Sequence, residues 1–365
     1  RGVAGRAETG QATDGPAGDI ADQLEAFYIS KGGFLRRADL AAHKTTVEDP
    51  VTVDYRGYTI CKCGPWTQGP FLLQALRLLE GFDLRAMGHL SADYIHVVIE
   101  AIKLAMADRD TYYGDPDFTN VPLELLLSDR YTEIRRSLID MRQASQEARP
   151  GDPYNMSALL PGGGSFRPGG GGTTTCVVAD GEGNVIAATP SANVSEYDGG
   201  EAGVTYSNRL TSFNTTPGHP NCIQPGKRPR ITLTPTLVLK DGRPVMAISV
   251  AGADMQDQVT LNLLLSIIEF GLAPEEAVCV PRFVTEHHQD SFNPTPNREE
   301  AFVQAGSLIV NDTLERRVLE ELAGRGHRLT AKQERLARPV IICLDEDGLM
   351  HAAGDPLARR HAAGL

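Results

Sequence analysis

The chain has 365 residues, of which 41% are hydrophobic, and its 47 acidic and 35 basic residues give a net charge of −12. This length and apolar content predict a globular chain of one large or two smaller domains rather than a disordered one. The acidic balance disfavours a nucleic-acid partner, which needs concentrated Lys and Arg, and with no run of ~18 apolar residues in the chain we expect no membrane span.

The first part of the chain predicts mainly helical structure after a small, polar opening segment. Two short strands are the exception, expected on either side of a turn at Arg56-Gly57. The Ser91 side chain is expected to cap the longest helix. In chain order the predicted elements are helix Ile20–Lys31, strands Val51–Val53 and Tyr58–Cys61, helix Phe71–Leu79, a helix from Ser91 to about Asp110, and helix Leu123–Ile139.

Composition changes between Arg142 and Gly172, where Pro, Gly, Ser and Gln dominate and apolar residues are few. That composition is typical of a linker. From Thr173 onward the pattern turns to strands and apolar helices in separate runs, which predicts layered α+β packing. The expected elements are strands Thr174–Ala179, Val185–Thr189, Thr236–Lys240 and Val245–Val250, helix Asp257–Phe270, a short helix from Pro274, helix Leu314–Gly324, and strands Pro339–Leu344 and Met350–Ala353.

Cysteine and histidine spacing gives no metal or cofactor signal. Of six cysteines only Cys61 and Cys63 lie close together, and C-x-C is too tight for the usual zinc or redox motifs. His287-His288 are adjacent on one predicted loop and would be poor joint ligands. The chain opens without Met or an apolar signal core. We therefore expect a soluble fragment whose compartment, cytoplasmic or secreted or periplasmic, is not indicated.

The junction between Gly169–Gly172 and Thr173 carries a chemical possibility. Glycine adopts bent backbone shapes at little steric cost, and a threonine hydroxyl can attack the carbonyl that precedes it. Cleavage there would free an α-amine with an ordinary pKa near ~8, which could act as the base for the hydroxyl of its own residue. On these residues alone, a linker followed by an ordinary strand is the simpler interpretation.

Motifs along the whole chain, from about Gly18 to near the C-terminus, resemble the γ-glutamyltransferase family of N-terminal-nucleophile hydrolases. Each motif is weak alone, but their order and spacing together are specific. They are Asp54–Tyr58, Gln68-Gly69-Pro70, Ala107-Asp108-Arg109 with Gly114–Phe118, Thr173–Thr175, Asp180–Asn184, Gly226–Pro229, Thr234-Pro235-Thr236, Phe270-Gly271-Leu272 and Pro281-Arg282-Phe283.

The resemblance implies a four-layer αββα sandwich and a precursor that cleaves itself before its nucleophile. By position the nucleophile is Thr173 and the cleavage site Gly172/Thr173, with Thr174 and Thr175 as alternatives because a run of threonines blurs the register. The implied pieces are 1–172, a mainly helical large-subunit-like region ending in the linker, and 173–365, the small-subunit-like region. Both would form one αββα domain, a heterodimer of cleavage products, and a homo-oligomer is possible.

The resemblance also assigns roles around Thr173. Ser191 and Asn193 match a hydroxyl and an amide that orient the nucleophile and contact substrate. The oxyanion turn, which is Gly-Gly in the family, falls at Ala251-Gly252, where the backbone N–H survives the change to Ala. Loop and strand-end positions without catalytic roles are the alternative interpretation of these residues.

Departures from the family pattern bear on the substrate. Arg209 replaces an amide, Ser212 replaces the carboxylate that would pair with a glutamyl ammonium, and the two carboxylate-binding serines fall at Ile231 and Thr232. An arginine repels a cation and attracts an anion. These changes argue against a γ-glutamyl pocket and favour an acylase-like branch.

We therefore expect a small-molecule acyl substrate, with an anionic group paired to Arg209 or Arg230 as one hypothesis. An oxamate-type amide or a C–C bond is an alternative target. A second class of function is also open, namely a catalytically silent, unprocessed homologue.

Overall fold

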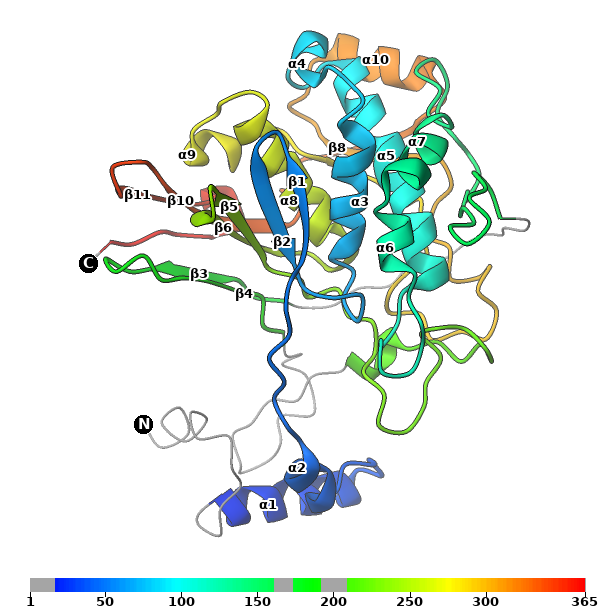
Figure 1. Ribbon diagram of the computed structural model, residues 1–365, viewed down its shortest axis with the longest axis vertical. Coiled ribbons are helices and arrows are strands. Elements are labelled where there is room, and N and C mark those ends of the chain that lie inside the picture. The colour runs from blue at the N-terminus through cyan, green and yellow to red at the C-terminus, as the bar shows by residue number, and fades with distance from the viewer. Residues whose placement is uncertain (1–16, 161–172, 192–208, 365) are drawn as a thin grey trace. The chain divides into compact units, whose positions relative to one another are not determined.

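The computed structural model describes residues 17–160, 173–191 and 209–364 (Figure 1). Residues 17–49 belong to one compact unit, and the described residues from Pro50 onward belong to another. The smaller unit holds helices α1 (Ala17–Ser30) and α2 (Arg37–Ala42). Helix α1 confirms the first predicted helix.

The core of the larger unit is one antiparallel sheet in the order β1-β2-β5-β6-β10-β11. Strand β2 pairs with β5, so residues that precede Thr173 and residues that follow it share this sheet. The tight turn predicted between β1 and β2 is confirmed, with Arg56 and Gly57 both at positive φ. The strands are β1 (Val51–Tyr55), β2 (Tyr58–Lys62), β5 (Thr236–Lys240), β6 (Arg243–Ala251), β10 (Arg338–Leu344) and β11 (Met350–Gly354).

Helices cover one face of this sheet. Helix α3 (Pro70–Leu79) packs on β1 and β2, α8 (Gln256–Ile268) packs on β6, and α5 (Ala92–Tyr112) packs behind α3. The predicted cap of α5 is present, because Ser91 Oγ accepts from the Tyr94 N–H at 3.1 Å. Helix α8 is buried on nearly all sides, which its almost unbroken apolar run Leu261–Ile268 requires.

A two-stranded hairpin, β3 (Cys176–Ala179) and β4 (Val185–Ala188), packs against β5, β6 and β10. The alternation of side chains along β6 shows that this hairpin lies on the face of the large sheet opposite to the helices. Ile248 and Val250 join the main apolar core, whereas Ser249 between them bonds to Thr189 and to the Ala188 carbonyl, both at 2.8 Å. The described residues thus hold a helical layer, a large sheet and two strands of a second sheet.

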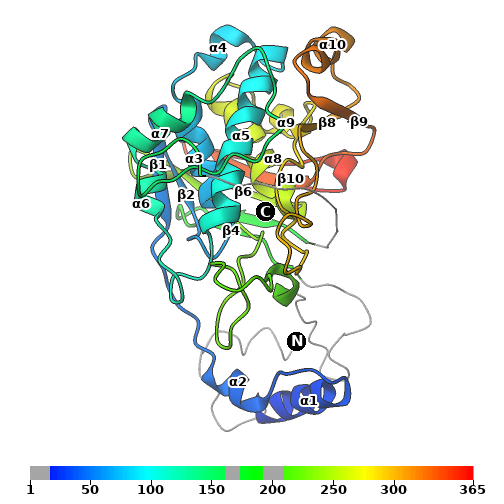
Figure 2. The same cartoon turned by 90° about the vertical axis from the view of Figure 1, so that its right-hand side faces the viewer.

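A third sheet of three strands was not predicted from the sequence. In it β7 (Phe283–Val284) is antiparallel to β8 (Ser307–Asn311), and β8 is parallel to β9 (Arg328–Lys332). Figure 2 shows β8 and β9 together with helix α10 (Arg316–Gly324), which packs on β9. All five residues of β8 are buried and its centre, Leu308–Val310, is apolar, so the strand lacks the alternation that marks a half-exposed strand.

One predicted helix is wrong in extent. The segment Leu123–Ile139 forms two short helices, α6 (Leu123–Leu126) and α7 (Asp129–Arg136), because the Ser128 side chain caps a new helix at its start. The remaining short helices are α4 (Leu84–Met87) and α9 (Pro274–Ala277).

The described part of the predicted linker, residues 142–160, contains no helix or strand but packs tightly. Arg149 pairs with the buried Glu100 at 2.8 Å. The Gly151 N–H donates to Asp108 at 2.8 Å, and Arg135 donates to the Ala158 carbonyl at 2.7 Å. Polar side chains of the surrounding helices therefore hold this segment in place. The composition of the segment alone could not predict this packing.

Candidate active site

Thr173 lies where the hairpin begins. The neighbouring Thr174 N–H donates to the Pro190 carbonyl at 3.0 Å, which extends the pairing of β3 and β4 by one step. Thr173 directly precedes Thr174 in the chain, and its hydroxyl lies 3.5 Å from the Ser191 hydroxyl. The hairpin thus brings together two residues eighteen positions apart that the sequence had assigned to one site.

Arg209 joins this pair from a different segment, the 3₁₀ turn Arg209–Ser212. Its guanidinium donates to the Ser191 hydroxyl and, at 3.4 Å, to the Thr232 hydroxyl. The Phe292 ring lies 5.0 Å from the guanidinium carbon, close enough for a cation–π contact. Burial lowers the pKa of Arg209, but an arginine keeps its charge in proteins. A buried positive charge therefore lies one hydroxyl away from Thr173.

The other predicted substrate-binding residues differ in which of their atoms make contacts. Thr232 is fully buried and contacts Arg209, as above. Ile231 is held through its backbone, by bonds to Trp66 and Gln68. Ser212 is buried, and its carbonyl accepts from Asn221 at 2.6 Å. Three of these positions, Arg209, Ile231 and Thr232, are thus connected by neighbouring contacts.

The Ala251-Gly252 segment forms a tight turn between β6 and α8. Gly252 has φ +158° and ψ 32°, and the next residue, Ala253, has φ +52°, a conformation that non-glycine residues rarely adopt. A Cβ on Gly252 would lie 2.7 Å from the Ala337 Cβ. Glycine at this position is therefore required by both torsion and space. Gly172 and Asn193, the two remaining predicted site residues, lie outside the described residues.

Sequence reasoning missed a buried charged network directly behind this turn. The Asp254 carboxylate accepts from Arg109 at 2.6 Å and from Ser291 at 2.5 Å. Burial alone would raise the pKa of Asp254, but the neighbouring Arg109 and other cations hold that pKa well below its usual range. Arg109 also contacts Asp110 at 2.8 Å. This ion pair lies near the end of α5 and connects that helix to the candidate site.

Arg230 belongs to the same network. It pairs with Asp110 at 3.1 Å and donates to Ser291 at 2.8 Å, and its side chain is 4% exposed. Of the two arginines considered for an anionic substrate, Arg230 is therefore engaged in structural ion pairing.

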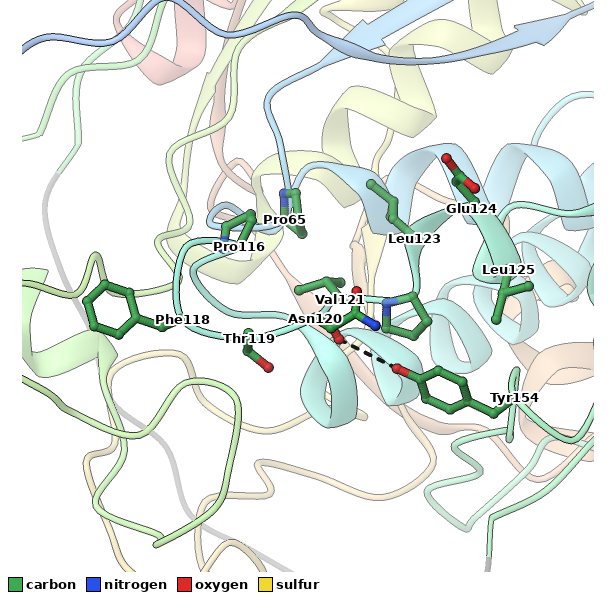
Figure 3. A pocket seen from close by; sticks show the side chains of 11 residues that line it. Pro65, Pro116, Phe118, Thr119, Asn120, Val121, Leu123, Glu124, Leu125 and Tyr154 are labelled. Carbon is green, nitrogen blue, oxygen red and sulfur yellow. Dashed lines mark hydrogen bonds between the residues drawn. The ribbon is translucent and has the colours of Figure 1, made fainter.

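A hollow on the described surface lies away from these residues. It has a volume of about 850 Å³ and an apolar lining that includes Pro65, Pro116, Val121 and Leu123 (Figure 3). At its edge the Tyr154 hydroxyl donates to the Asn120 carbonyl at 3.5 Å. None of the predicted site residues lines it.

The described residues contain neither a cluster of metal-ligating side chains nor a helix able to cross a membrane. No group of three or more His, Cys, Asp or Glu side chains there is arranged to hold a metal ion. No described helix combines the length and apolar character needed to cross a membrane.

Comparisons with known proteins agree with this fold. The glutathione hydrolase proenzyme of Escherichia coli (strain K12) is 32% identical over 357 residues, which cover 93% of this chain and 56% of that protein. The acylase ACY 1 proenzyme of Pseudomonas sp. (strain SE83) is 30% identical over 352 residues, or 94% of this chain and 57% of that protein. The crystal structure of a cephalosporin acylase from Bacillus halodurans matches with a TM-score of 0.78 and 28% identity, over 93% of this chain and 57% of that one.

The fold is therefore the α+β sandwich of the N-terminal-nucleophile hydrolases, as expected from the sequence. Residues 14–365 match the family model described as gamma-glutamyltranspeptidase, and the chain belongs to that family. Acylases stand among its relatives beside glutathione hydrolases. The chain spans little more than half of the length of the relatives named above.

Proposed function

We propose that this chain is the nucleophile-bearing part of a self-processing amidohydrolase or acyltransferase, with Thr173 as the nucleophile. The observation that carries the proposal is the continuous set of contacts from Thr173 through Ser191 and Arg209 to Thr232. The two relatives named as proenzymes support self-processing. Cleavage at Gly172/Thr173 would give pieces 1–172 and 173–365, which stay together through the sheet that both share.

The geometry favours Thr173 over its neighbours. The Thr174 N–H is engaged with the Pro190 carbonyl, and the buried Thr175 hydroxyl has no hydrogen-bond partner within the described structure. Thr173 alone of the three has its hydroxyl against Ser191. A hydroxyl partner of this kind can orient a nucleophile.

The proposed reaction has two steps. The Thr173 hydroxyl attacks the substrate carbonyl while its own α-amine takes the proton, and backbone N–H groups at Ala251-Gly252 stabilise the negative oxygen that forms. The ammonium then returns the proton to the leaving amine, and an ester remains on Thr173. Water hydrolyses that ester to release an acid, or an amine accepts the acyl group. Both outcomes regenerate the hydroxyl.

The acyl group of the substrate is proposed to be anionic. Arg209 brings a positive charge to the site and contacts Thr232, a position where the family binds a carboxylate. Ser212 lacks the negative charge that would hold a glutamyl ammonium. An acidic, non-glutamyl acyl group, including an oxamate-type amide, fits this pattern better than glutathione.

The experiment is to purify the chain and follow its cleavage on a denaturing gel, with N-terminal sequencing of any fragment. We expect the 39.4 kDa chain to give a fragment that begins at Thr173. Thr173→Ala should abolish both the cut and turnover of acyl amides, whereas Thr174→Ala should keep the cut. A wild-type chain that stays whole would instead support a silent homologue, and a fragment beginning at Thr174 or Thr175 would move the nucleophile.

A further inference from the structure

The turn at Ala251-Gly252 is held in an unfavourable backbone conformation. Ala253 follows this turn and has φ +52°, in the left-handed region. That conformation costs free energy for any L-residue that carries a Cβ. Such conformations persist where surrounding contacts over-determine them. The contacts that do so here identify positioning residues not assigned so far.

Two buried glutamines bridge the turn to the substrate segment. The Gln68 amide nitrogen donates to the Thr232 carbonyl and to the Ala253 carbonyl, each at 3.3 Å. The Gln256 amide, with its nitrogen facing the carbonyls, donates to the same Thr232 carbonyl at 2.8 Å and to the Val250 carbonyl at 3.1 Å. Both glutamines thus share one acceptor, and their other bonds lie on either side of Ala251-Gly252.

The orientation of Gln68 is fixed from behind. Arg109 donates to the Gln68 side-chain oxygen at 2.9 Å, so the amide nitrogen must face the two carbonyls. Arg109 is itself held by Asp254, the residue after the strained Ala253. Gln68 and Arg109 are 0% exposed and Gln256 is 1% exposed, so water does not compete for these bonds.

We propose that Gln68 and Gln256 are positioning residues that set the distance between the oxyanion turn and the Ile231-Thr232 segment. This inference rests on the proposed function for its catalytic consequence. A substrate held at Thr232 and an oxyanion held at Ala251-Gly252 must be placed together, and a shift of about 1 Å in such a site can cost ~10²-fold in rate. The pair acts on the backbone and touches no reacting atom.

The test uses Gln68→Met and Gln256→Met, which keep length and approximate volume but remove the amide. The matched control is Gln74→Met, another buried glutamine, which donates to Asp108 at 2.6 Å and contacts neither segment. Two readouts are compared: hydrogen exchange of backbone amides at residues 230–234 and 250–256, and steady-state kinetics with an acidic acyl amide.

Gln68→Met and Gln256→Met should each raise the rate of hydrogen exchange in both segments by at least ~10-fold, whereas Gln74→Met should leave both rates unchanged. With substrate, kcat should fall by ~10–100-fold and KM should change by less than ~3-fold, because ground-state contacts are kept and transition-state placement is lost. Unchanged exchange in both segments would overturn the proposal, as would an equal kcat loss in Gln74→Met. A wild-type chain without Thr173-dependent turnover would count against the proposed function only. The exchange result would still decide whether Gln68 and Gln256 position the two segments.

Discussion

At the scale of single residues, Arg209 carries the proposal that the substrate is not a glutamyl compound. The sequence alone showed an arginine where the family has an amide. The structure adds that its guanidinium contacts both the Ser191 hydroxyl, which lies beside the proposed nucleophile, and the Thr232 hydroxyl. A positive charge in that position can select an anionic substrate and can also orient Ser191. The two roles predict different effects of an Arg209 substitution on acidic and neutral substrates.

If Arg209 selects an anionic acyl group, Arg209→Gln should lower kcat/KM for an acidic acyl amide by ~10–150-fold relative to its neutral analogue, because hydrogen bonds to charged groups contribute ~1.5–3 kcal/mol. Arg209→Lys should keep part of this preference, since it retains charge without the planar fork. The measurement is kcat/KM for the matched pair of amides. Equal losses on both substrates would leave only the orienting role.

The expected proximity of Thr173 and Ser191 is observed, because local structure brings these two residues together. Thr173 and Ser191 are joined by a hairpin whose turn, Asp180–Asn184, is visible in the sequence. Gln256 could not be assigned in this way, because its partner Thr232 is brought close only by packing of separate segments. The start of α8 carries several polar residues, so the sequence does not single out Gln256.

At the scale of elements, a buried serine of the large sheet makes polar contacts with the hairpin that carries Thr173. Ser249 lies in the middle of β6, is 1% exposed, and bonds to both Thr189 and the Ala188 carbonyl. Apolar side chains occupy the neighbouring positions on the other face of β6. We therefore expect the position of the proposed nucleophile to depend on the buried Ser249 hydroxyl.

Ser249→Ala should destabilise the protein by about 1–3 kcal/mol, because it leaves the buried Thr189 hydroxyl without its partner. Self-cleavage should slow as well, since the start of the hairpin is less well placed. Chemical denaturation and the time course of fragment formation would measure the two effects. Ser137→Ala, at an exposed hydroxyl, is the control and should change neither; a Ser249→Ala chain as stable and as quickly cut as the wild type would contradict the prediction.

Elements with a clear periodicity were predicted well, and those defined by tertiary contacts were not. Strands β5 and β6 and helix α8 lie close to their expected bounds. The β8 strand was missed because burial on both faces removes the alternating pattern. The break between α6 and α7 depends on one capping serine inside a helical pattern.

At the scale of the whole molecule, the larger unit buries many ionisable groups, and several are histidines held neutral by their partners. His287 Nδ1 accepts from the Gly306 N–H at 2.9 Å, and its Nε2 lies 2.9 Å from the Glu147 carbonyl. His219 is arranged alike, with Nδ1 accepting from Asn221 at 3.0 Å. A second proton on either ring would have to displace a donor that already points at Nδ1.

These arrangements set the direction of the acid response. Burial lowers the pKa of His287 to about 3 and that of His219 to about 4. The unfolded chain, with histidine pKa values near ~6.5, therefore binds more protons than the folded one between pH ~6.5 and these values, and stability must fall as pH falls through that window. Burial also raises the pKa of Asp257 to about 6, which acts in the opposite sense between pH ~4 and 6 and offsets about one histidine. His89, His96 and His327, whose pKa values are also lowered by burial, add to the histidine effect.

We therefore predict that the free energy of unfolding decreases from pH 6.5 to pH 4.5, and that His287→Gln reduces this decrease by about 2 kcal/mol, the contribution of one histidine over that range. The variant should be less stable than the wild type at pH 7, because one of its two buried bonds is lost, yet its stability should depend less on pH. Urea denaturation at several pH values measures both quantities, with the exposed His351 changed to Gln as the control that keeps the wild-type slope. If His287→Gln and the wild type lose stability in parallel on acidification, the ring at His287 is not held neutral by its partners, and the acid response must come from carboxylates such as Asp254.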